Sequence, residues 1–361
     1  MGAFSGIGAG CFRRVLMRIP RVAVYPRHFV WRLGLCDGDV IDELCSVAGF
    51  RYGGIMTESS ELVMIPGMQG RTHVLTLRPE PGVAVRGGWL FVHGHGEYAR
   101  RYVELFADSV AAGWVVVIPD LPGHGLSDGK RGHLRGFGEL AVLFQWCQRV
   151  LAGEVGSSGR IVLGGHSMGG LVVAWLVATG AVRPAAVWMG SPLLDPSYNK
   201  PWALVAMARV LDVLCPRLVI SNGVDQAHCY ALEVGDSPEM RADVDPEADK
   251  FERREVVHRW ISMRLGMELM RAAEDVWRVV PAAWPSGVPL VFTQGGKDPV
   301  CPVDVARQFT AQMAAGGHVD VRYHEMDDAL HEPHRDAHRE QLLAAVRGVL
   351  EEGAQVTEAG A

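Results

Sequence analysis

The chain has 361 residues, of which 48% are hydrophobic and 21% are charged, so it can bury a large core and global disorder is not expected. Its formal net charge of −6 argues against nucleic acid as a partner. The seven cysteines lie far apart without a CxxC pair, which favours reduced thiols over a disulfide framework.

The first 36 residues contain six arginines, no acidic residue and many apolar side chains. Such a segment can lie on an anionic membrane surface, or it can pack on the core as an extension. Pro20 and Pro26 interrupt it, and it lacks the apolar run of a secretory signal. No apolar stretch is long enough to span a membrane, so we expect a cytoplasmic protein with a candidate peripheral membrane contact in residues 1–36.

From about residue 60, short apolar runs alternate with longer amphipathic stretches. The first two runs, around two glycines, predict an antiparallel hairpin. The later runs are continuously apolar, which predicts a parallel sheet covered by helices on both faces. The predicted strands are 62–65, 73–77, 89–92, 114–118, 161–164, 185–189, 289–293 and 319–323, and the predicted helices are 98–112, 137–151, 168–178, 303–315 and 335–350.

One region breaks this alternation. No strand is predicted between residues 196 and 284, where helical stretches at 201–214 and 255–280 flank an acidic segment. We predict a helical cap insertion at residues 196–285, whose apolar side chains either line an acyl pocket or pack the cap onto the sheet. The predicted core comprises 58–195 and 286–352, with an N-terminal extension at 1–57 and a polar tail at 353–361.

The run GHSMG at residues 165–169 is the strongest chemical signal in the chain. An apolar run leads into this GxSxG pattern, and a stretch rich in Leu, Val and Ala leaves it. This is the context of a nucleophile elbow, a strained strand-to-helix turn that exposes a serine hydroxyl. The alternative is an ordinary Gly-rich loop before a helix. We predict that Ser167 is the nucleophile.

A serine hydroxyl is a weak nucleophile and needs a base that is oriented by an acid. In folds with this elbow the acid follows the serine in the chain, and the histidine comes last. Asp298 comes just after the predicted strand 289–293, at the end where such sheets place active-site groups. A turn cap is the alternative, because Asp-Pro is common in turns. We predict that Asp298 is the acid.

Four histidines follow the last predicted strand, 319–323. His331 lies in the loop before the terminal helix, and we predict that it is the base. His324 is still close to the strand, whereas His334 and His338 fall where the helix begins and are expected on a solvated face. His331, His334 and His338 also have the spacing of metal ligands on a helix, but an intervening proline disfavours a metal site.

The loop after the predicted strand 89–92 reads HGHGE at residues 93–97. A loop of this kind can direct a backbone N–H at the oxyanion that forms during acyl transfer. We predict that the backbone amides of His95 and Met168 are the two oxyanion donors. A zinc site of the His-x-His type at His93 and His95 is the alternative, which we disfavour because no cluster of other ligands accompanies them.

Three runs together resemble the monoacylglycerol lipase and lysophospholipase group of α/β-hydrolases, which is also described as serine aminopeptidase-like. They are HGHGEYARRY at 93–102, DLPGHGLSDG at 120–129 and GHSMGG at 165–170, and Asp298 and His331 also match. The resemblance covers about residues 58–350. It implies a mostly parallel eight-stranded α/β-hydrolase sheet with helices on both faces and an inserted helical cap. It also implies that Glu97 orders the oxyanion loop and that the cap shapes a tunnel for an acyl chain.

We therefore predict a serine esterase or lipase that hydrolyses carboxylic esters of lipid-like substrates, of the monoacylglycerol or lysophospholipid class, through an acyl-enzyme. The chemistry requires no cofactor and no metal. Thioesterase, peptidase and acyltransferase activities are alternatives on the same fold. A non-catalytic ligand-binding protein is an alternative of another class, against which a complete set of serine, histidine and aspartate argues.

Overall fold

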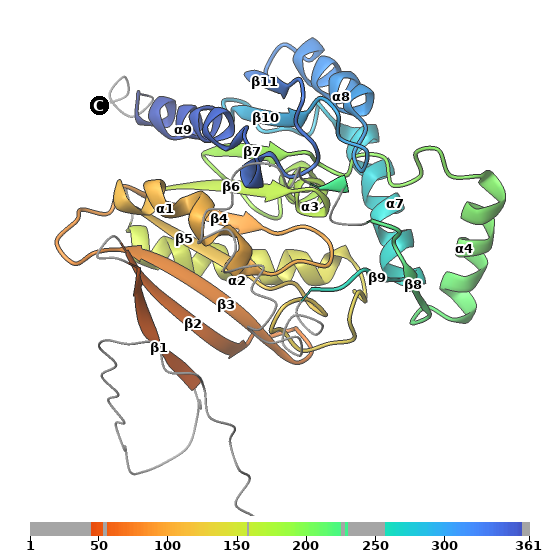
Figure 1. Cartoon of the computed structure of the whole chain (residues 1–361), viewed down its shortest axis with the longest axis horizontal. Helices are drawn as coiled ribbons and strands as arrows, with labels where there is room; N and C mark the ends of the chain where they lie inside the picture. Colours follow the sequence, from red (N-terminus) through yellow and green to blue (C-terminus); the bar gives the residue numbers. More distant parts are fainter. Residues whose placement is uncertain (1–44, 53–55, 157–158, 225–227, 230–256, 356–361) are drawn as a thin grey trace, which may run out of the picture. The chain divides into compact units, whose positions relative to one another are not determined.

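A computed structural model of the chain describes residues 45–52, 56–156, 159–224, 228–229 and 257–355 (Figure 1). The segment 1–36, which is a candidate membrane contact from its sequence, lies outside the described residues. The strands are β1 (Cys45–Tyr52), β2 (Met56–Met64), β3 (Arg71–Pro79), β4 (Gly87–Val92), β5 (Trp114–Pro119), β6 (Arg160–His166), β7 (Ala186–Gly190), β8 (Val219–Ser221), β9 (Trp260–Ser262), β10 (Leu290–Gly295) and β11 (Val321–Met326). The helices are η1 (Ala99–Tyr102), α1 (Val103–Ala111), α2 (Phe137–Val155), α3 (Met168–Ala178), α4 (Trp202–Leu214), α7 (Met263–Val279), α8 (Val303–Ala315), η3 (Pro333–Arg335) and α9 (Arg339–Gln355).

Nine of the strands form one sheet in the order β1-β2-β3-β5-β4-β6-β7-β10-β11. β1, β2, β3 and β5 pair antiparallel, and the six strands from β5 to β11 pair parallel. All eight predicted strands are present, and the predicted α/β class with a mostly parallel sheet is confirmed. The ninth strand is β1, which extends the antiparallel edge and lies before residue 58, where the predicted core begins.

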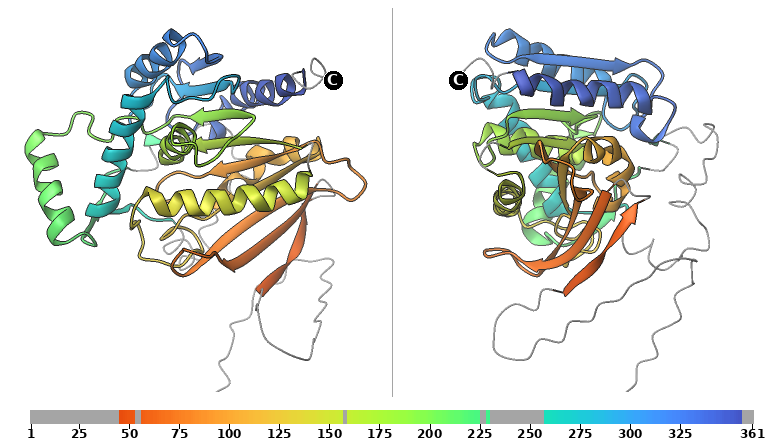
Figure 2. Two further views of the ribbon diagram at one scale, coloured as in Figure 1. Left: turned by 180° about the vertical axis from the view of Figure 1, so that it is seen from behind. Right: turned by 90° about the vertical axis from the view of Figure 1, so that its left-hand side faces the viewer.

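The core lies on both faces of this sheet. In β4, Leu90 and Val92 point into one buried cluster, and Trp89 and Phe91 point into the other, as the two-residue period of a strand requires. Residues of α2, α3 and α8 complete the first cluster, and residues of α1 and α9 complete the second. Helices therefore cover both faces of the sheet (Figure 2), and the ends of the parallel strands are left to carry loops.

Between β7 and β10 the chain leaves the sheet and forms α4, β8, β9 and α7. Both helices were predicted, but the expectation that this region contains no strand is wrong, because β8 and β9 form an antiparallel pair. Three-residue strands are too short to give a detectable period in the sequence. α7 packs against both α3 and α4, so it joins the insertion to the helix that follows Ser167.

The insertion carries apolar side chains on its surface. Trp202, Met207 and Leu214 of α4 are 83%, 53% and 70% exposed, whereas Met263 and Met267 of α7 are buried. The apolar residues that the sequence places in this region are therefore divided between the surface of α4 and the packed side of α7. Among the described residues, no helix has the length and apolar character needed to cross a membrane.

Candidate active site

Ser167 lies on a sharp turn between β6 and α3. Its φ of 55° and ψ of −120° are unusual for a non-glycine residue and cost about 1–3 kcal/mol of backbone strain. The turn is held because the Ser167 amide donates to the carbonyl of Gly190 at 2.9 Å, and the Leu193 amide donates to the Ser167 carbonyl at 2.9 Å. These bonds fix the serine at the carboxyl end of β6.

The glycines of the GHSMG run allow two close approaches. A Cβ on Gly169 would stand 2.1 Å from the carbonyl oxygen of Val92, and a Cβ on Gly165 would stand 2.5 Å from that of Gly169. Any larger residue would push the start of α3 away from β4 and β6. The glycines therefore let the helix begin directly behind the loop that follows β4.

The structure brings together the three predicted catalytic side chains from three separate loops. His331 Nε2 lies 2.9 Å from Ser167 Oγ, and His331 Nδ1 lies 2.7 Å from Asp298 Oδ2. Asp298 follows β10, and His331 follows β11, the neighbouring parallel strand. All three residues are buried. The hydroxyl, the imidazole and the carboxylate thus form one hydrogen-bonded chain.

The carboxylate of Asp298 is fixed by its own loop. Its Oδ1 accepts hydrogen bonds from the amides of Val300 at 2.8 Å and Cys301 at 2.9 Å. Its Oδ2 accepts a further bond from Gln294 Nε2 at 3.1 Å, besides the bond from His331. With four donors around it, the carboxylate is oriented toward His331 before any ligand binds.

Opposing effects act on the pKa of His331. Burial alone would lower the pKa, because it disfavours the imidazolium. The charge and the hydrogen bond of Asp298 outweigh burial, helped by the carboxylates of Glu332 and Glu97, and the pKa is raised above 6.5. The site therefore stabilises a protonated His331, which is what a base needs after it has taken a proton.

The loop after β4 is held from within. Glu97 Oε2 accepts a hydrogen bond from the Gly94 amide at 3.0 Å and another from the Tyr102 hydroxyl. Burial disfavours the Glu97 carboxylate, but the charge of Arg101, nearby histidines and the Tyr102 bond together hold its pKa below the usual range. Glu97 is thus an anion that fixes the backbone one residue before His95, the ordering role that the family resemblance implies.

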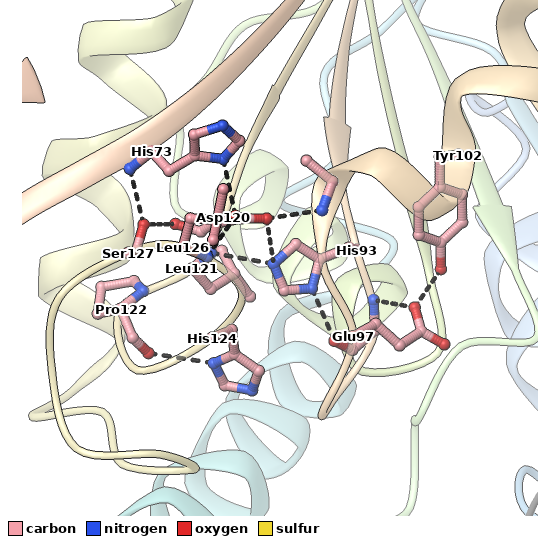
Figure 3. A network of polar contacts seen from close by, with 12 residues as sticks. His73, His93, Glu97, Tyr102, Asp120, Leu121, Pro122, His124, Leu126 and Ser127 are labelled. Carbon is pink, nitrogen blue, oxygen red and sulfur yellow. Dashed lines mark hydrogen bonds and ion pairs between the residues drawn. The ribbon is translucent and has the colours of Figure 1, made fainter. Parts of the chain in front are cut away.

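Asp120, which directly follows β5, joins three chain segments through its side chain (Figure 3). Its Oδ1 accepts from the Ala99 amide at 2.6 Å, and its Oδ2 accepts from the Leu126 amide at 2.8 Å and lies 2.7 Å from His73 Nδ1. Asp120 is fully buried, so these partners replace its lost water. The network ties the chain at Ala99, just after the β4 loop, to β3 and to the loop that follows β5.

The structure separates the two histidines of the HGHGE run. His93 Nδ1 lies 2.8 Å from the Gly94 carbonyl and Nε2 accepts from the Leu121 amide at 3.0 Å, so both ring nitrogens are engaged (Figure 3). The His-x-His chelate considered from the sequence would require His93 to break these bonds. The His95 ring lies instead beside His124, with 3.5 Å between His95 Nδ1 and His124 Nε2.

A second group of side chains near His331 was not found from the sequence. His166 Nε2 donates to the His331 carbonyl at 3.0 Å, and His166 Nδ1 lies 3.1 Å from the Tyr102 hydroxyl. The expectation that His334 is solvated is wrong, since it is buried and its ring stacks on that of Tyr102 at 5.3 Å. The bend at η3 turns His334 inward, which a helical pattern beginning near residue 335 does not predict.

Three residues that follow parallel strands of one sheet and meet at its carboxyl edge, with the serine on a strained turn into a helix, have the arrangement of the α/β-hydrolases. The chain belongs, within that fold, to the family described as serine aminopeptidase, S33, whose model matches residues 84–338. This match covers the sheet from just before β4 to the loop after β11.

Individual relatives agree with this assignment. A monoacylglycerol lipase of Mycolicibacterium smegmatis is 31% identical over 254 residues, which are 68% of this chain and 84% of that protein. Phospholipase YtpA of Bacillus subtilis is 26% identical over 260 residues, which are 72% of this chain and 92% of that protein. Among solved structures, the monoacylglycerol lipase of Paleococcus ferrophilus has a TM-score of 0.63 and 26% identity, and the match covers 79% of this chain and all of that one.

Proposed function

We propose that the protein is a serine esterase that hydrolyses carboxylic esters of lipid-like substrates through a covalent acyl-enzyme. The observation that carries this proposal is the hydrogen-bonded chain from Ser167 Oγ through His331 to Asp298. A buried serine hydroxyl that faces a histidine, itself oriented by a carboxylate, is the arrangement that converts a weak nucleophile into a strong one.

In the first half of the reaction, His331 Nε2 accepts the proton of the Ser167 hydroxyl while Oγ attacks the ester carbonyl carbon. The imidazolium that forms is stabilised by Asp298, whose own geometry does not have to change. The carbonyl oxygen becomes an oxyanion, and we assign its two donors to the backbone amides of His95 and Met168. When the tetrahedral species collapses, His331 gives its proton to the leaving alcohol oxygen, and the acyl group stays on Ser167.

In the second half, a water molecule takes the place of the alcohol. His331 Nε2 accepts a proton from this water, and the water oxygen attacks the acyl carbon. Collapse of the second tetrahedral species returns the proton to Ser167 Oγ and releases the carboxylic acid. Every proton transfer uses the same ring nitrogen, so these steps require only the residues named.

Two observations favour a lipid-like substrate. Two relatives, matched over 84% and 92% of their lengths, are a monoacylglycerol lipase and a phospholipase. The exposed apolar side chains of α4 provide a surface on which an aggregated substrate can rest, because burial of each large apolar side chain contributes about 1.5–3 kcal/mol. We therefore propose substrates of the monoacylglycerol or lysophospholipid class, with contact to a lipid surface through α4 and residues 1–36.

The test combines active-site labelling with a substrate series. The wild-type protein should react with a fluorophosphonate probe in a one-to-one ratio and hydrolyse p-nitrophenyl esters and monoacylglycerols. Ser167→Ala should lose both properties while keeping its melting temperature, and Ser197→Ala, which changes an exposed serine, should keep them. One-to-one labelling of the Ser167→Ala protein would refute the nucleophile assignment.

The same series separates the alternative activities on this fold. Faster turnover of a thioester or of an aminoacyl amide than of any matched ester would favour a thioesterase or a peptidase. Formation of a new ester in the presence of an added alcohol would indicate acyl transfer. A wild-type protein that binds lipid but neither turns over nor labels would favour a ligand-binding protein.

A further inference from the structure

A cysteine thiol that the proposed reaction does not use lies beside Ser167 and Asp298. Cys301 follows Asp298 by three residues, is buried, and its thiol contacts the Ser167 hydroxyl. The Cys301 sulfur, an Asp298 oxygen and a His331 ring nitrogen all lie within 4.8 Å of one another. Among the described residues, these three are the group of His, Cys, Asp or Glu side chains whose ligand atoms lie close enough together to share one metal ion.

The three donors have the chemistry of a zinc site. Thiolate, imidazole and carboxylate are the ligands that zinc uses, whereas magnesium and calcium prefer sites made of oxygen alone. Bonds of about 2.0–2.3 Å to a tetrahedral zinc ion separate neighbouring donors by roughly 3.3–3.8 Å. The Cys301 sulfur, which lies within 4.8 Å of the other two donors, would have to move closer to hold such an ion, and coordination at His331 Nδ1 would also open its 2.7 Å contact with Asp298 Oδ2.

The surroundings already orient one of these donors. The amides of Val300 and Cys301 hold one oxygen of Asp298, and Gln294 donates to the other. Hydrogen bonds of this kind around a ligating carboxylate fix its direction and raise the affinity of a metal site. The burial of all three side chains also removes water that would compete for the ion.

The Cys301 side chain is buried beside Asp298 and His331. A bound cation replaces the thiol proton, because a coordinated thiol is deprotonated.

We propose that Asp298, Cys301 and His331 form an inhibitory site for a zinc-class divalent ion, an inference that rests on the proposed function for its regulatory meaning. On binding, a metal–sulfur bond forms, the thiol proton passes to solvent, and one ring nitrogen of His331 becomes a ligand. Coordination at Nε2 blocks the proton transfer from Ser167, and coordination at Nδ1 breaks the bond to Asp298. The ion thus switches the site off reversibly, and a chelator restores it.

The first experiment measures binding without activity. Cadmium, a thiolate-binding probe of the same class, is titrated into the Ser167→Ala protein, and the cadmium–thiolate absorption in the near ultraviolet is followed. We expect one strong equivalent, which Cys301→Ser in the same background removes and Cys215→Ser, which changes an exposed cysteine, preserves. Equal absorption with and without the Cys301 thiol overturns the proposal.

The second experiment measures inhibition of the full-length enzyme. Zinc should inhibit turnover of a short soluble ester, magnesium at the same concentration should not, and a chelator should reverse the effect. Because a direct ligand is lost, Cys301→Ser should require at least about tenfold more zinc for half inhibition. In this variant the main-chain amide of residue 301 still donates to Asp298, so the carboxylate should keep its position. If a thermal melt shows that Cys301→Ser is unfolded, Cys301→Ala is used in its place.

Two outcomes separate this inference from the proposed function. Cadmium binding through Cys301 in a protein that hydrolyses no ester would support the metal site and refute the proposed esterase activity. If the protein hydrolyses esters and Cys301→Ser is as sensitive to zinc as the wild type, the proposed esterase activity is supported and the metal site is overturned. Loss of cadmium binding in Cys229→Ser to the same extent as in Cys301→Ser would also overturn it, since the site would then be a pair of thiols.

Discussion

His331 Nδ1 lies 2.7 Å from Asp298 Oδ2, and the two side chains are buried together at the ends of adjacent strands. This contact decides the balance between two effects on the imidazole. Burial disfavours the charged ring, and the carboxylate, with more distant acidic groups, overcomes burial so that the pKa rises above 6.5. The pKa of His331, the proposed base, is therefore raised chiefly by a buried carboxylate from the neighbouring loop.

The pH profile should report this balance. A base must be unprotonated to accept the Ser167 proton, so a raised pKa of His331 predicts that kcat/KM falls on the acid side with a midpoint above pH 6.5. Asp298→Asn should lower kcat by up to about 10⁴-fold, as in serine-protease triads, and should move the midpoint to lower pH because burial then dominates. Rates measured against pH with a soluble p-nitrophenyl ester give both values. An unchanged midpoint would show that Asp298 does not set the pKa.

Loss of His331 should affect turnover, whereas loss of His334, three residues later, should affect stability. His331→Ala should remove turnover as completely as Ser167→Ala, because the base is gone. His334→Ala should instead destabilise the fold by about 1–3 kcal/mol, because it deletes a buried ring that stacks on Tyr102, while fluorophosphonate labelling persists. Labelling rates and thermal melts of both variants are the measurement. A labelled and active His331→Ala protein would move the base to His334.

Glu97 should act through the position of the oxyanion loop. Glu97→Gln keeps the shape of the side chain but removes the anion that accepts bonds from Gly94 and Tyr102. If the His95 amide, the proposed oxyanion donor, is displaced, kcat should fall by roughly tenfold to a hundredfold with little change in KM. A catalytic group misplaced by about 1 Å carries a cost of this size. Glu104→Gln, on the exposed side of α1, is the matched control. A rise in KM at constant kcat would mean that Glu97 contacts substrate instead.

The sequence predicted those parts of the site whose signals are local. Ser167 stands in a short pattern in which close approaches of the backbone require glycine. Asp298 and His331 each follow a strand that was predicted from its run of apolar residues. The parallel pairing of β10 and β11 then brings these two loops together. For this reason the placement of both residues needed no knowledge of distant contacts.

Other features depend on contacts that no local pattern records. His166 meets the carbonyl of His331 across 165 positions of the chain, and Arg101 pairs with Glu332 across 231. β8 and β9 are three residues each and form a sheet only because the chain returns to pair them. β1 is an edge strand with an irregular register, and so its pairing with β2 is not evident from alternation. These features follow from the fold after it has formed, whereas the strands and the GHSMG turn specify it.

The last prediction concerns residues 1–36, which lie outside the described residues but carry six arginines and no acidic side chain. If they bind an anionic surface, each arginine contributes on the order of 1 kcal/mol, and salt weakens the binding. Deletion should then reduce co-sedimentation with anionic vesicles and turnover of aggregated monoacylglycerol. Turnover of a soluble short-chain ester should be unchanged, because Ser167, Asp298 and His331 all lie downstream. If the segment packs on the core, deletion should lower the melting temperature and leave vesicle binding as it was. Pro20 and Pro26 disfavour one long amphipathic helix, so the melt and the sedimentation must be measured on the same truncated protein.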